Sequence, residues 1–239
     1  MNASQKTVGE FAVEFPNATR LFEQLGIDYC CGGNRPLEEA CADAGVSVDE
    51  VMHWQELSSK PEKDEPNFAK VSLKTLITHI VEKHHVYTRS EIERLRALIE
   101  KVWNAHGANH PEIARLSSTF RALGAELEPH MTKEELVLFP YILRLEEATL
   151  SHHSVGTPPF RTVANPVHMM NKEHEGAGYL LSQMRQITSD YTTPPDGCIS
   201  YQTLYKALDE FEQDLHQHIH LETNILFPRA IEMEIGLLA

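Results

Sequence analysis

The sequence predicts an all-α protein, a four-helix bundle preceded by a small helical N-terminal domain. Four long stretches repeat apolar residues at steps of three and four, which is the period of a helix that buries one face. Loops containing glycine and proline separate these stretches. A charged segment with two prolines, SKPEKDEPN, divides the chain into a domain over 1–58, a linker over 59–67 and the bundle over 68–239.

The N-terminal domain is expected to contain a short helix followed by a turn that reads DYCCGG. The apolar face of this helix consists of Ala18, Leu21, Phe22 and Leu25. Adjacent cysteines rarely form a disulfide with each other because the ring is strained, so Cys30 and Cys31 remain available as thiolates, which are soft ligands for iron or nitrosyl groups. Glycines at 32 and 33 remove side-chain cover over the thiols. The alternative is a buried structural cysteine pair.

The four helices of the bundle follow in order. They are expected over about 70–103, 111–145, 165–191 and 199–234. Pro111 and Pro166 suit the first turn of a helix, and Asn165 suits the capping position before it. Pro129 removes one backbone donor from the second helix and should kink it. The helix is predicted to continue, because its apolar stripe passes through this position.

Each helix places a histidine on its apolar face. These residues are His85, His130, His174 and His218. Glu134 and Glu222 lie one turn further along the same face of the second and fourth helices, and Val137 and Tyr141 continue the stripe of the second. A buried carboxylate without a partner costs several kcal/mol, and a metal ion compensates it well. The alternative for any one position is a core histidine that is hydrogen-bonded within the protein.

The same pattern occurs twice along the chain. His130 opens HMTKEELVLFP and His218 opens HIHLETNILFP, so that histidine, glutamate and Leu-Phe-Pro recur at equal spacing. His85 precedes His130 by 45 positions, and His174 precedes His218 by 44. Two matched helical hairpins would supply equivalent ligands to two metal ions, with the glutamates bridging them. Imidazoles and carboxylates together suit borderline transition metals.

Other histidines and cysteines receive lesser roles. His84 is the rival of His85, but the apolar seam and the duplicated spacing both favour His85. His216 and His220 lie off the seam and are expected at the surface or behind the ligands. A structural role is assigned to Cys41 and Cys198.

Composition argues against several classes of protein. The formal net charge of −14 disfavours nucleic acid as a partner. No apolar run is long enough for a membrane span, and the N-terminus lacks the features of a secretory signal. Four cysteines in 239 residues are too few for a disulfide scaffold. We therefore expect a cytoplasmic protein with no membrane partner.

The motifs resemble those of a known family. The helical segment is similar to a hemerythrin-type bundle, and together with DYCCGG the whole chain resembles the repair-of-iron-centres family. The resemblance assigns the metal ligands as His85, His130, Glu134, His174, His218 and Glu222. It implies two non-haem iron ions, bridged by an oxo group and by Glu134 and Glu222. It also implies the repair of iron–sulfur clusters damaged by nitric oxide or peroxide, and our first hypothesis is that the chain donates iron to the damaged proteins.

Three other functions compete with iron donation. The same centre would serve an enzyme that reduces nitric oxide, or a sensor that binds O₂ or nitric oxide reversibly. A bundle filled with zinc would perform no chemistry. In the repair hypothesis, Cys30 and Cys31 handle iron or nitrosyl groups. The sequence leaves open whether the chain is an enzyme and whether it forms a homodimer.

Overall fold

The structure is a computed structural model that describes residues 5–57 and 66–238. In the described ranges its regular elements are helices, and there is one isolated β-bridge, between Thr7 and Pro36. The predicted all-α class, a helical bundle with a helical N-terminal region, is confirmed. None of the helices in the described ranges has the length and hydropathy needed to cross a bilayer. Most of the predicted linker over 59–67 lies outside the described residues.

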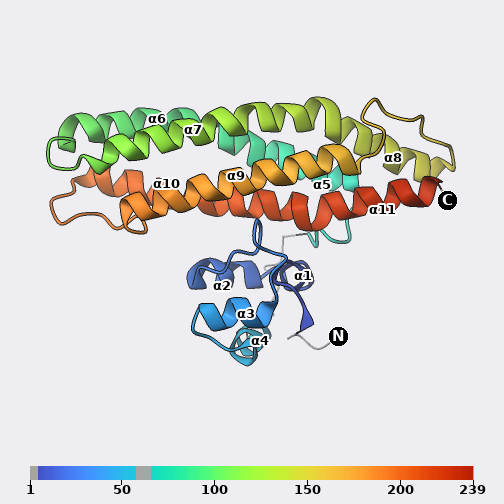
Figure 1. The fold of residues 1–239 in the computed structure, drawn as a ribbon, viewed down its shortest axis with the longest axis horizontal. Coiled ribbons are helices and arrows are strands. Elements are labelled where there is room, and N and C mark those ends of the chain that lie inside the picture. Colours follow the sequence, from blue (N-terminus) through green and yellow to red (C-terminus); the bar gives the residue numbers. More distant parts are fainter. Residues whose placement is uncertain (1–4, 58–65, 239) are drawn as a thin grey trace. The chain divides into compact units, whose positions relative to one another are not determined.

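The N-terminal region contains four short helices (Figure 1). They are α1 (Val8–Glu14), α2 (Ala18–Leu25), α3 (Leu37–Asp43) and α4 (Val48–Leu57). Helix α1 begins with a capping box, in which the Thr7 hydroxyl accepts from the Glu10 backbone N–H and the Glu10 carboxylate accepts from the Thr7 backbone N–H. Helix α2 ends at Gly26, whose φ of 66° lies in the left-handed region that glycine adopts without strain. The predicted short helix is therefore present.

The described residues 66–238 contain four long helical stretches (Figure 1). The first comprises α5 (Leu73–His79), η2 (Ile80–His85) and α6 (Val86–His106), and the second α7 (Glu112–Lys133), η3 (Glu134–Leu138) and α8 (Phe139–Ser151). The third is α9 (Ala164–Thr188), and the fourth comprises α10 (Ile199–His220), η4 (Leu221–Leu226) and α11 (Phe227–Leu238). Helix α7 runs through Pro129 without ending, as predicted.

The elements η2, η3 and η4 are π-helical turns, and each contains or adjoins a predicted metal ligand. A π turn holds one more residue than an α turn, so the side chains that follow it rotate to a different face. For this reason one position of the predicted seam is wrong: Val137 is 50% exposed, whereas its neighbour Leu138 is buried. Such turns occur often at functional sites.

The chain divides into two compact units. The first unit comprises Met1–Thr78, Leu143–Gly156 and His216–Ala239, and the second comprises His79–Ile142 and Thr157–Leu215. In the second unit, the buried rings of Phe120 and Phe211 meet edge to face with their centroids 5.7 Å apart. In the first unit, the Glu146 carboxylate accepts from the backbone N–H groups of Leu73 and Lys74 at 2.6 and 2.9 Å, and so caps the start of α5.

Candidate metal centre

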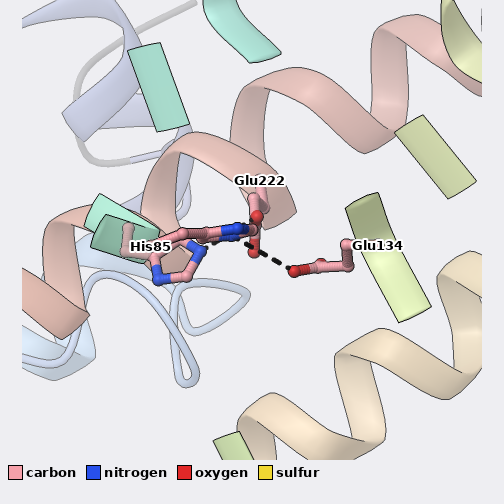
Figure 2. Close-up of side chains that lie close together, drawn as sticks. His85, Glu134 and Glu222 are labelled. Carbon is pink, nitrogen blue, oxygen red and sulfur yellow. Dashed lines mark hydrogen bonds and ion pairs between the residues drawn. The ribbon is translucent and has the colours of Figure 1, made fainter. Parts of the chain in front are cut away.

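In the second unit, the Glu134 carboxylate lies between two imidazoles. Its Oε2 is 3.5 Å from Nε2 of His85, and its Oε1 is 3.4 Å from Nε2 of His130. All three side chains are almost fully buried. Figure 2 shows the His85 ring and the Glu134 carboxylate pointing toward one another. One carboxylate therefore presents a different oxygen to each of two histidines.

A third histidine of the second unit converges on the same place. Nε2 of His174, on α9, lies 3.1 Å from Nε2 of His130, on α7. The ligand atoms of His130, Glu134 and His174 all lie within 4.8 Å of one another. Imidazole nitrogens and carboxylate oxygens brought this close in a buried site suit a divalent transition metal, which also compensates for burial of the carboxylate charge.

Two further carboxylates contact the other ring nitrogen, Nδ1, of His85 and His130. Nδ1 of His85 is 2.6 Å from Oε1 of Glu135, which also accepts from Arg89 Nη1 at 2.8 Å. Nδ1 of His130 is 2.8 Å from Oε2 of Glu173, whose other oxygen accepts from Lys133. Burial raises the pKa of both carboxyls, but the hydrogen bonds from the cation and the histidine outweigh it and leave each pKa below its ordinary value.

The two histidines that competed in the sequence have different surroundings. His84 is buried as well, but its Nδ1 lies 3.0 Å from Oδ1 of Asp214, and its ring meets that of His79 edge to face. His85 is the one whose Nε2 faces Glu134. The structure therefore brings His85, and not His84, together with Glu134 in the second unit.

The first unit contains the remaining pair of predicted ligands. His218, on α10, and Glu222, on η4, lie one turn apart, both buried, with Nε2 of His218 3.0 Å from Oε1 of Glu222. The same helical stretch supports the DYCCGG turn. Asn224 donates to the Tyr29 carbonyl oxygen at 2.9 Å, and Gln217 donates to the Tyr29 hydroxyl at 2.8 Å. A Cβ at Gly33 would lie 2.6 Å from the Tyr29 carbonyl oxygen, so this close approach requires glycine.

The two cysteines of this turn differ in exposure. Their Sγ atoms are 3.7 Å apart, so they are not joined by a disulfide, as predicted. Asp28 accepts from the backbone N–H of both, and Asp28, Cys30 and Cys31 form a group able to hold a metal ion. The expectation of uncovered thiolates is wrong for Cys30, because it is buried and its hydrogen bond to Cys31, together with burial, raises its pKa well above the ordinary value. Cys31 is only partly buried.

Two other sequence interpretations need correction. Of the two positions expected for His220, at the surface or behind the ligands, the first is wrong: it is 3% exposed, meets the Tyr29 ring edge to face, and burial lowers its pKa to about 4. Cys198 is not buried within a core but exposed, with Sγ 3.1 Å from Nε2 of His106. Hydrogen bonds from His106 and from backbone N–H groups lower the Cys198 pKa to about 7.

Comparison with known proteins adds the family. Residues 76–230 match the hemerythrin HHE cation binding domain, and residues 4–59 match a domain of unknown function, DUF542. A probable iron–sulfur cluster repair protein of Haemophilus influenzae is 33% identical over 97% of this chain and 99% of its own length. The iron–sulfur cluster repair protein YtfE of Salmonella paratyphi B is 36% identical over 95% of this chain and 97% of its own length.

The chain belongs to the hemerythrin-domain family of iron–sulfur cluster repair proteins. This confirms the resemblance that the HxxxE and DYCCGG motifs indicated. The HHE domain is a cation-binding domain, and the histidine and glutamate clusters found here supply donors that suit iron, so the bundle is a metal-binding domain. Sequence reasoning missed Glu135 and Glu173; the signal was a carboxylate directly beside a predicted ligand, Glu134 or His174, in the sequence.

Proposed function

We propose that this chain is a di-iron protein that repairs iron–sulfur clusters damaged by nitrosative or oxidative stress, by donating iron to them. Two relatives that each align with more than nine-tenths of the chain carry the name of iron–sulfur cluster repair protein. The observation that carries the di-iron part is the Glu134 carboxylate, which turns one oxygen toward His85 and the other toward His130.

The proposed centre has two metal positions that share both glutamates. On this proposal His85 and His218 serve one position and His130 and His174 the other, while Glu134 and Glu222 are shared, as the duplicated motif and the family resemblance imply. The duplicated motif supports this assignment, because it gives each position two histidines and gives the two positions the same two carboxylates. Burial supports it as well, since two carboxylates withdrawn from water need compensating positive charge.

This donor set favours release of iron over permanent retention. The proposed donor set contains imidazoles and carboxylates but no thiolates, which hold iron more firmly. Protons also compete with the metal for imidazole and carboxylate ligands. Iron bound there would supply an exchangeable, redox-active metal. Cys30 and Cys31, beside Asp28, are proposed to handle iron or nitrosyl groups. The proposed recipients are damaged iron–sulfur proteins of the cytoplasm, and the small ligands are nitric oxide, O₂ or peroxide.

The first test is the metal content and optical spectrum of protein purified anaerobically. Wild type is compared with the double variant Glu134→Ala/Glu222→Ala and with a control, Glu93→Ala/Glu128→Ala, which removes two half-exposed or exposed carboxylates that pair with Arg96. We expect about two irons per chain in the wild type and control, from the two ligand groups, and loss of iron in the first double variant. Zinc, or no metal, in the wild type would refute the proposal.

The second test is transfer. Iron-loaded protein is mixed anaerobically with a [4Fe–4S] dehydratase inactivated by peroxide, and recovery of the dehydratase is followed with and without an iron chelator. Recovery that consumes the bound iron supports donation. If the iron stays in place while nitric oxide is consumed in the presence of an electron donor, the chain acts as a reductase instead.

A further inference from the structure

His85 and His130 are held from both sides of the ring. In each, Nε2 faces Glu134, and Nδ1 contacts a second carboxylate, Glu135 for His85 and Glu173 for His130. The Nδ1 contacts, at 2.6 and 2.8 Å, are shorter than the contacts of Nε2 with Glu134, at 3.5 and 3.4 Å, so we assign the ring proton to Nδ1. The Nε2 lone pair then points inward, toward Glu134, where a metal would need it.

Both second carboxylates reach across from another helical stretch. Glu135 follows Glu134 in η3 and contacts His85 at the end of η2. Glu173 precedes His174 in α9 and contacts His130 in α7. Each contact therefore joins the immediate neighbour of one proposed ligand to the imidazole of another, and links two stretches at the level of the centre.

Each second carboxylate is in turn held by a cation near the surface. Arg89 binds Glu135, with side chains 39% and 27% exposed, and Lys133 binds Glu173, with side chains 47% and 29% exposed. The two chains of contacts, Arg89–Glu135–His85 and Lys133–Glu173–His130, thus run from half-exposed cations to buried imidazoles.

We propose that Glu135 and Glu173 are positioning residues that orient His85 and His130 and set the rate at which the centre gives up its metal. The proposal rests on the proposed metal centre. A carboxylate that accepts from Nδ1 fixes the ring orientation and increases the basicity of Nε2, and losing such a partner typically weakens metal binding about 10- to 100-fold. Arg89 and Lys133 hold the carboxylates in place, so that the rate of release depends on ion pairs that solvent or a docking protein can reach.

The test measures release of Fe²⁺, and separately of Zn²⁺, from the loaded full-length protein to a chelator. The variants are Glu135→Ala, Glu173→Ala and the shape-conserving Glu135→Gln and Glu173→Gln. Glu128→Gln is the control, because Glu128 lies on α7 near His130 but pairs with Arg96 at 3.5 Å. We expect release about 10- to 100-fold faster in the alanine variants, a smaller effect in the glutamine variants, and the wild-type rate in the control.

Two further measurements separate a positioning role from a general effect on the stability of the fold. Denaturation of the metal-free glutamine variants should leave the midpoint near that of the wild type, although their release is faster. NMR of metal-free wild type with ¹⁵N-labelled histidine should show the proton of His85 and His130 on Nδ1. Wild-type release rates in the folded glutamine and alanine variants, or a proton on Nε2 in the wild type, would overturn the inference.

Measuring the release of both metals separates this inference from the proposed function on which it rests. If the wild type retains zinc but no iron, and the variants release zinc faster, the iron proposal fails and the positioning role stands. If the wild type loads with iron and the variants release it at the wild-type rate, the positioning role fails alone. A wild type that holds neither metal refutes both.

Discussion

Replacing Asn224 by alanine tests how the DYCCGG turn is attached to the helical stretch that contains His218 and Glu222. The Asn224 side-chain amide has two N–H donors. It lies 2.9 Å from the Tyr29 carbonyl oxygen and 2.9 Å from Nδ1 of His220. Because burial lowers the His220 pKa to about 4, the ring is neutral at pH 7 and its Nδ1 can accept. One amide therefore satisfies two acceptors.

The expected cost follows from these contacts. Each lost hydrogen bond is worth about 1 kcal/mol net, and a buried acceptor left without a partner adds about 1–3 kcal/mol. His220 is 3% exposed, so the added cost applies to its Nδ1. We expect Asn224→Ala to lower the free energy of unfolding by about 3–5 kcal/mol. The variant should also speed the reaction of Cys31 with a thiol reagent, because Tyr29 is released.

Urea denaturation of the metal-free protein and the rate of thiol modification are the two assays. Gln213→Ala is the control, because the Gln213 amide is exposed and bonds only across one helical turn to Asp209 at 2.8 Å among its described hydrogen bonds. Its expected change is within about 0.5 kcal/mol. An Asn224→Ala protein as stable as this control, with an unchanged thiol rate, would show that the amide does not hold the turn.

Three further changes have defined outcomes. The alkylation rate of Cys198 should rise with pH to a half-maximum near pH 7, since only the thiolate reacts, and His106→Ala should move that midpoint upward. A midpoint near the ordinary thiol value of about 8.5 would contradict the lowered pKa. Glu146→Ala removes the cap on α5 and should cost about 1–2 kcal/mol, with faster amide exchange at Leu73; unchanged exchange would exclude a capping role. Phe120→Ala leaves a cavity beside Phe211 and should cost about 3–5 kcal/mol in a denaturation experiment, where a loss below about 1 kcal/mol would be inconsistent with a packed core.

Helical period was enough to predict much of the fold and the buried faces. Steps of three and four along the helix place His130, Leu127 and Phe120 on one stripe, and all three are buried. The stripe can be predicted without knowing the opposing helix, because the spacing of side chains around a helix is set by its own backbone. The period failed at Val137, where the π turn of η3 adds a residue and turns Leu138 inward instead.

The amino-acid sequence alone determined that histidines and glutamates recur on apolar helix faces, and hence that metal was the most economical explanation of their burial. Only the tertiary structure decided which partner each side chain meets. Glu135 and Glu173 reach histidines on other helical stretches, and Tyr29 of the N-terminal region meets the His220 ring edge to face. The physical reason is that local periodicity orients a side chain relative to its own helix axis, whereas contacts, burial and shifted pKa values depend on which other elements pack against that face.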